Sequence, residues 1–191
     1  MSYAIGIDLG GSSAKAVSVS TDGALIEQAT VGFDPAVPMQ WAERIRILVE
    51  EFQAKRGTPA LAVGLSAPGL PKDNGRSIAC LPERLRGLEG FEWGPYLGTS
   101  RPVPVLNDAH AALLGEAWVG AARGLKNVIM LTLGTGVGGA ALVDGRLLRG
   151  EIGRAGHFGH SCLDPCGPPD ICGTPASLEM GRLQTGIRPS A

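Results

Sequence analysis

Apolar residues along the chain follow two spacings, one typical of β-strands and one typical of α-helices. Segments with the length and residue pattern of strands are found at 3–9, 14–20, 24–31, 60–66, 103–106, 127–133, 140–143 and 146–148. A helix predicted over 38–55 has one apolar face, formed by Trp41, Ile45, Leu48, Val49 and Phe52. A second helix is predicted over 109–121, and a third begins within 177–183. Together these elements predict an α/β fold.

A strand, a glycine turn and a second strand occur twice, near 5–20 and near 128–143. This is an approximate internal duplication rather than a short-period repeat. Between the two copies, the segment 70–101 is rich in proline and glycine and has little periodicity. A long irregular connection of this kind inside a compact domain is often functional.

Both glycine turns have the composition of a phosphate-binding turn, because glycines between two strands let backbone N–H groups converge on phosphate oxygens. The candidate ligands in the first turn are Asp8, Gly10, Gly11, Ser12, Ser13 and Lys15. Within that set, Asp8 is placed to hold Mg²⁺ through water. The candidate ligands in the second turn are Gly134, Thr135, Gly136 and Gly138. An ordinary hairpin is the alternative interpretation of each turn.

A carboxylate follows the strand at 103–106, in the pair Asn107-Asp108, where a helix is predicted to begin. A plain helix cap is the simplest interpretation of such a pair. The position of the pair between two phosphate-type turns favours a catalytic role instead, because phosphoryl transfer to an alcohol needs a placed carboxylate that accepts the hydroxyl proton.

Several segments, in this order and at these spacings, resemble the ROK family of sugar kinases and repressors. They are DLGGSSAK at 8–15, SAPG at 66–69, PVLNDAHAALLGEAW at 104–118, LGTGVGG at 133–139 and GEIGRAGHFGH at 150–160. The resemblance implies an actin-like ATPase fold of the ribonuclease H-like type. It implies a complete N-terminal domain over 1–118 and the start of a similar domain over 119–191, most of which is absent from the chain.

The implied activity is glucokinase-like: ATP-dependent phosphorylation of a hexose or an N-acetylhexosamine, with Mg²⁺. The resemblance assigns Asp108 as the general base, and as sugar ligands Gly69, Asn107, Asp108, His157, His160 and Glu179. His157 stands where the family pattern A-G-E-x-G-H has a glutamate, and a histidine offers fewer hydrogen-bond acceptors. A non-catalytic sugar-binding module of the same fold is therefore the alternative. The two phosphate-type turns, taken without the other segments, would also fit another actin-like ATPase, such as an acyl-group kinase.

The family commonly has C-x-C-G-x-x-G-C after its histidine. Here His160, Cys162, Cys166 and Cys172 supply four candidate zinc ligands, at an unfamiliar spacing. We favour buried or free thiols over a structural Zn²⁺ and predict no side chain that binds a metal directly. The resemblance also implies a homodimer. Because the first glycine motif begins at residue 8, we do not expect the helix-turn-helix that precedes it in ROK repressors.

Composition and charge limit the classes of binding partner that we expect. The 191 residues include 44% hydrophobic and 18% charged residues, with a net charge of −1 and no basic run, so nucleic acid is not an expected partner. No apolar run reaches the ~18 residues of a membrane span. The N-terminal sequence lacks the pattern of a signal peptide, and a cytoplasmic location is expected.

Overall fold

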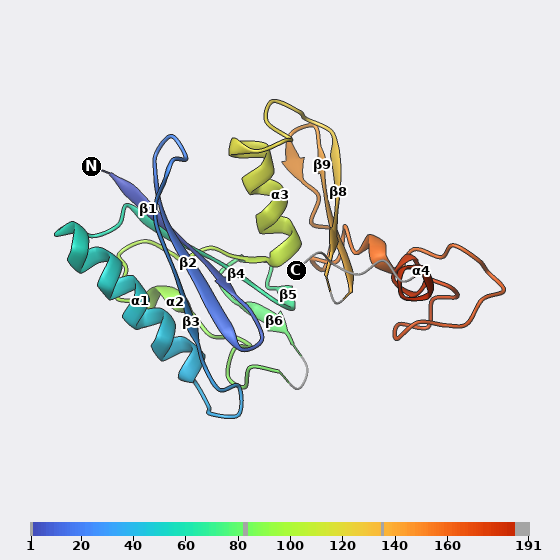
Figure 1. The fold of residues 1–191 in the computed structure, drawn as a ribbon, viewed down its shortest axis with the longest axis horizontal. Coiled ribbons are helices and arrows are strands. Elements are labelled where there is room, and N and C mark those ends of the chain that lie inside the picture. The colour runs from blue at the N-terminus through green and yellow to red at the C-terminus, as the bar shows by residue number, and fades with distance from the viewer. Residues whose placement is uncertain (1, 82–83, 135, 186–191) are drawn as a thin grey trace. The chain divides into compact units, whose positions relative to one another are not determined.

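The computed structural model describes residues 2–81, 84–134 and 136–185, with the side chains of 182–185 left out. These residues form two compact units, one up to Asp108 and one from Ala109 onward (Figure 1). The predicted domain boundary at residue 118 lies at the far end of helix α3 (Asp108–Val119). Through Ala109 and Leu113, that helix packs within the second unit.

The first unit is built on a five-stranded sheet with the order β3-β2-β1-β4-β7. Its strands are β1 (Tyr3–Leu9), β2 (Ser13–Ser20), β3 (Leu25–Gly32), β4 (Ala62–Ala67) and β7 (Val105–Asn107). The first three strands form the predicted antiparallel meander, whereas β4 runs parallel to β1 and β7 runs parallel to β4.

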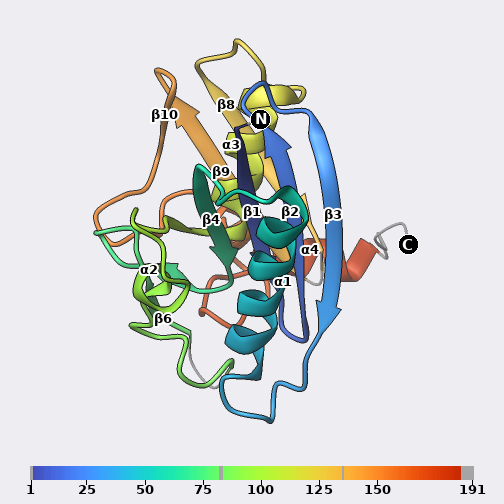
Figure 2. The same cartoon turned by 90° about the vertical axis from the view of Figure 1, so that its left-hand side faces the viewer.

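Helix α1 (Gln40–Arg56) covers one face of this sheet (Figure 2). The predicted apolar face is confirmed, since all five of its residues are buried, namely Trp41, Ile45, Leu48, Val49 and Phe52. The helix ends where Gly57 adopts a left-handed conformation with φ 65°, which glycine tolerates without a steric penalty. The helical spacing of the apolar residues therefore predicted both the helix and the face that packs against the core.

The segment predicted to be irregular contains three short elements: β5 (Leu70–Pro71), β6 (Ile78–Cys80) and α2 (Trp93–Tyr96). Strands β5 and β6 pair antiparallel. An aromatic cluster then ties the segment to α1, because the rings of Phe91 and Trp93 lie edge-on to Trp41, with centroids 5.2 and 5.5 Å away. The segment is therefore anchored by buried side chains that have no regular spacing.

The second unit contains a three-stranded antiparallel sheet with the order β10-β9-β8. Its elements are β8 (Val128–Leu133), β9 (Val137–Val143), β10 (Arg146–Leu147), the single-turn 3₁₀ helix η1 (Phe158–His160) and α4 (Leu178–Thr185). This meander repeats the arrangement of β1, β2 and β3, as the duplication in the sequence predicted. Strand β9 begins earlier than predicted, so that Gly138 pairs with Thr132 inside the ladder.

Strand β8 is apolar on both faces. Val128 and Met130 pack against the cluster around Leu113. The alternate residues Ile129, Leu131 and Leu133 are 71%, 46% and 55% exposed. Strands that are apolar on both faces are typical of sheets covered on both sides. Within the described residues, no helix has both the length and the apolar character needed to cross a membrane.

Candidate functional site

In the first unit, polar residues gather at the carboxyl ends of three parallel strands. Asp8 of β1 is in register with Ser66 of β4, and the next residue of β4, Ala67, is in register with Asn107 of β7. Asp108 follows Asn107 directly and is the first residue of α3. Ligands of open α/β sheets bind at this edge. The fold therefore brings three of the predicted site residues to a position suited to ligand binding.

Asp8 is an exposed carboxylate fixed by a buried neighbour. The Ser66 hydroxyl donates a hydrogen bond of 2.7 Å to Oδ1 of Asp8. Ser66 is buried. Ile7 and Leu9, on either side of Asp8 in the chain, are buried in the core and fix the position of β1. An oriented carboxylate that faces solvent fits a Mg²⁺ ion held partly through its hydration water. The magnesium role of Asp8 stays a prediction.

The first glycine turn is a tight hairpin between β1 and β2. The Gly10 N–H donates to the carbonyl of Ser13 at 2.8 Å, and the Phe33 N–H donates to the carbonyl of Ser12 at 2.9 Å. These bonds leave Gly11 and Ser12 at the tip of the hairpin. The predicted cation Lys15 is exposed on β2, in register with Asp8.

Gly69 occupies a position that only glycine fits. Its φ is +100°, and a methyl group built on it would lie 2.6 Å from the carbonyl oxygen of Cys80. Its own carbonyl accepts a hydrogen bond of 3.4 Å from Nδ2 of Asn107. The conformation of Gly69 thus brings its backbone beside the Asn107 side chain and helps to orient that amide, next to Asp108.

In the second unit, the other glycine turn is bonded to helix α4. The Gly134 N–H donates to the carbonyl of Gly136 at 3.0 Å, while Thr135 lies outside the described residues. The Val137 N–H donates to Oε2 of Glu179 at 2.7 Å. Two segments that the sequence analysis singled out separately are therefore in direct contact.

Ser177 begins the helix that carries Glu179. It is fully buried, and its hydroxyl accepts a hydrogen bond of 3.4 Å from the Met180 N–H. A serine in this position satisfies backbone donors at a helix start. The cap therefore fixes Glu179 in the first turn of α4, where its carboxylate reaches the glycine turn.

The two predicted histidine ligands flank the short helix η1. His157 precedes η1 and is exposed, whereas His160 is its last residue and is half-buried. The His160 N–H donates to the carbonyl of His157 at 3.2 Å. The preceding Gly156 has φ +94°, and a methyl group built on it would lie 3.0 Å from Cα of Ala140 in β9. This close approach sets both histidines against the sheet of the second unit.

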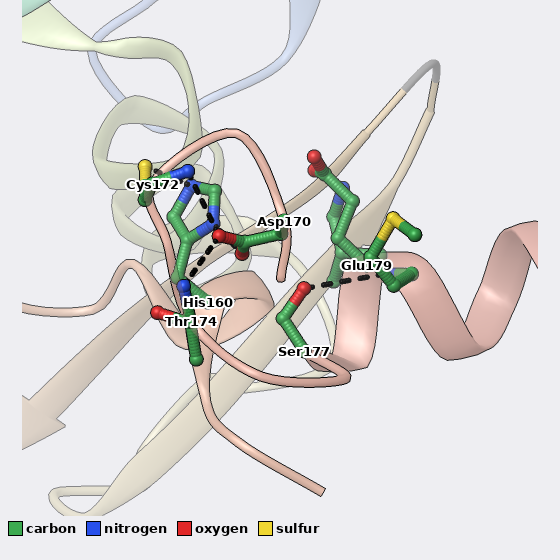
Figure 3. A network of polar contacts seen from close by, with 8 residues as sticks. His160, Asp170, Cys172, Thr174, Ser177 and Glu179 are labelled. Carbon is green, nitrogen blue, oxygen red and sulfur yellow. Dashed lines mark hydrogen bonds and ion pairs between the residues drawn. The ribbon is translucent and has the colours of Figure 1, made fainter. Parts of the chain in front are cut away.

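His160 is bonded to an acidic residue that the sequence analysis missed (Figure 3). Oδ2 of Asp170 lies 2.8 Å from Nδ1 of His160, and the Asp170 side chain is only 2% exposed. Its Oδ1 accepts hydrogen bonds from the backbone N–H groups of Cys172 and Thr174, at 2.8 and 2.9 Å. The bond to His160, followed by those to the backbone, holds the pKa of Asp170 well below its usual range.

The four candidate zinc ligands do not come together among the residues that the structure describes. Within the described part of the chain, the group that gathers is His160, Asp170 and Cys172, whose ligand atoms lie within 4.8 Å of one another. Cys162 and Cys166 are not in it. The sequence did contain a sign of Asp170. The family pattern C-x-C-G-x-x-G-C aligns with residues 170–177, where Asp170 takes the place of the first cysteine and Ser177 that of the last.

The His160 group does not fit a zinc site as it stands. His160 binds Asp170 directly, and both oxygens of Asp170 already accept N–H donors. Sγ of Cys172 lies 3.7 Å from Nε2 of His160. The donor atoms are satisfied by one another, so hydrogen bonds account for the order of this loop.

Replacing Asp170 with asparagine is expected to destabilise the chain at pH 7. Because the Asp170 pKa is lowered in the folded protein, its ionised form contributes stability above the unfolded pKa of about 4, and that contribution is lost as the pH falls further. Thermal unfolding at pH 7 and at pH 3 measures this. The loss for Asp170→Asn should shrink at pH 3, and Asp164→Asn, at an exposed carboxylate bonded to the Cys166 N–H, is the control. Equal losses for both variants would contradict the assignment.

The comparisons with known proteins cover almost the whole chain. The family model described as "ROK family" matches residues 4–190. The chain is 35% identical to the glucokinase of Thermotoga maritima over 96% of its own length and 58% of that protein. It is 34% identical to the N-acetylmannosamine kinase of Citrobacter koseri, over 98% of the chain and 63% of that protein.

Among solved structures, the chain resembles the ROK glucokinase of Streptomyces griseus in complex with glucose and AMPPNP. The TM-score is 0.70 at 33% identity, over 93% of this chain and 56% of that one. The chain thus has the actin-like fold of these kinases. It spans about three fifths of the length of the curated relatives it matches.

Proposed function

The chain belongs to the ROK family, and we propose that it transfers a phosphoryl group from ATP to a hydroxyl of a hexose or an N-acetylhexosamine. One observation carries the proposal. Asp8, Asn107 and Asp108 lie at the carboxyl edge of one parallel sheet, where a glycine hairpin also ends β1. Phosphoryl transfer depends mainly on such positioning and on electrostatic stabilisation.

Asp108 acts as the general base. As the sugar hydroxyl oxygen bonds to the γ-phosphorus of ATP, its proton passes to the Asp108 carboxylate. The bond from the γ-phosphorus to the bridging oxygen then breaks, and ADP leaves. Asp8 would hold Mg²⁺ through its hydration water, and the bound ion would neutralise charge along the phosphates.

The remaining site residues orient the substrates. The Asn107 amide and the Gly69 backbone bind sugar hydroxyls in the first unit, and the hydrogen bond between them supports this role. In the second unit His157, His160 and Glu179 are further sugar ligands. The backbone of the two glycine turns, with Ser12, Ser13 and Lys15, binds phosphate. Two chains form a homodimer, which sedimentation would test.

The substrate is identified by a coupled ADP-release assay on the purified chain with MgATP. The sugars are glucose, mannose, N-acetylglucosamine and N-acetylmannosamine, which cover the classes named for the relatives. Turnover with one of them is expected. ADP release that does not depend on added sugar would instead indicate a different ATPase.

A sugar-binding module without catalysis is the second candidate. It is favoured by one observation: His157 replaces the glutamate of the family pattern, which removes acceptors for sugar hydroxyls. Calorimetry with the same sugars separates the two candidates. Sugar binding by a folded chain that transfers no phosphate would favour the module.

A further inference from the structure

An arginine from the irregular segment lies over the first glycine turn. A methyl group built on Gly11 would lie 3.0 Å from Nη2 of Arg84. Both residues belong to the first unit, and 73 positions along the chain separate them. The guanidinium therefore takes up the space that a side chain at position 11 would fill. Nothing in the spacing of the sequence singles out Arg84.

The backbone that carries Arg84 is held by the core. The next residue, Leu85, is 4% exposed although its φ is +46°, a left-handed conformation that is costly for a bulky side chain. The buried Leu88 donates its N–H to the Leu85 carbonyl at 3.0 Å. The Gly90 N–H donates to the carbonyl of Ile78 in β6 at 2.9 Å. Arg84 thus projects from an anchored turn, with an exposed side chain.

Among the described residues, Arg84 forms no ion pair with a carboxylate. Lys15, the other cation near this hairpin, is also exposed. A guanidinium presents five N–H donors in a planar fork that matches phosphate oxygens, and it stays charged at every physiological pH. The local arrangement is thus one cationic fork directly above a tight glycine hairpin.

From this arrangement we infer that Arg84 binds the terminal phosphates of the phosphoryl donor at the first glycine turn. Glycine at position 11 leaves room for the guanidinium and the phosphate together. The ligand chemistry is a chain of phosphates, supplied either by ATP or by inorganic polyphosphate. As a contribution to catalysis the inference rests on the proposed kinase function, because charge on the transferred group must be stabilised as it moves.

The test is calorimetric binding of two probes, Mg²⁺-AMPPNP and inorganic tripolyphosphate, without sugar. Arg84→Met removes the charge and keeps much of the side chain. It should weaken binding of the probe by about 30-fold, the effect of losing a charged hydrogen-bonded contact. Arg84→Lys keeps the charge without the fork and should fall in between. Arg86→Met is the matched control, with an equal charge change at an exposed position two residues along the same segment. It should bind within about twofold of the parent chain.

The outcomes separate this inference from the proposed function. Equal binding by Arg84→Met and the parent, equal weakening by Arg84→Met and Arg86→Met, or no binding of either probe by the parent would each overturn the inference. Arg84-dependent binding in a chain that phosphorylates no sugar would support it and refute the kinase assignment. Tripolyphosphate binding that depends on Arg84 shows contact with the phosphates themselves, whereas binding of AMPPNP alone identifies the nucleotide as the source.

Discussion

Replacing Asp108 with asparagine is expected to lower the rate of sugar phosphorylation by about 1,000-fold, the typical contribution of a positioned general base. The amide keeps the shape of the carboxylate but cannot accept the hydroxyl proton at neutral pH. Asp108 is exposed at the start of α3, so few packing contacts are at risk. The measurement is kcat in the coupled ADP-release assay.

The control for Asp108→Asn is the same exchange at Asp73, an exposed aspartate in the connection between β5 and β6 of the same unit. Asp73→Asn should keep the activity of the parent chain. Asp73→Asn should unfold at the same temperature as the parent, and Asp108→Asn should remain folded by circular dichroism. An Asp108→Asn variant with full turnover would show that another group takes the proton.

Replacing Gly69 with alanine is expected to cost about 3 kcal/mol of the free energy of unfolding, because a strained backbone and a steric overlap combine. The φ of +100° disfavours any side chain, and the new methyl group would lie 2.6 Å from the Cys80 carbonyl oxygen and 3.1 Å from Cβ of Leu81. Backbone atoms cannot move aside as the end of a long side chain can. Urea unfolding followed by Trp fluorescence measures the loss.

Gly98→Ala is the matched control, since Gly98 also has a positive φ, +62°, but a methyl group there would meet nothing within 4 Å. It should cost only about 1 kcal/mol, the strain of the left-handed conformation. Similar losses for both variants would show that the contact with Cys80 does not matter. The Gly69 carbonyl also holds the Asn107 amide, so Gly69→Ala should raise the KM for the sugar even where the chain remains folded.

Elements with a regular spacing were predictable from the sequence. The apolar face of α1 and the two meanders follow from periods of 3.6 and 2, and both are present. The Asn107-Asp108 pair was predicted to follow a strand and begin a helix, and it does so. Their place at the same sheet edge as Asp8 depends on parallel pairing through β4, which local patterns could not give.

Contacts between distant segments were not predictable from spacing. Arg84 reaches Gly11 from a turn that Leu85 and Leu88 anchor, and no period marks those leucines. Asp170 is a small acidic residue in a loop, and its importance shows only when His160 is folded against it. Such residues act through tertiary contacts, which local propensity does not record.

Two features of the second unit also follow from packing. Strand β9 extends back to Val137 because glycine offers no obstacle to extended pairing, which draws Gly138 and Gly139 into the ladder with β8. Helix α3 joins the second unit because Leu113 is fully buried there, in a cluster with Ala140 and Leu142. In both cases packing decided where an element belongs.

The most direct test of the central claim is mass spectrometry of the sugar after incubation of the purified chain with MgATP and each candidate substrate. The account predicts a sugar monophosphate, formed together with ADP and absent when Asp108 is replaced by asparagine. Unmodified sugar in every reaction, from a chain shown to be folded by circular dichroism, would contradict it.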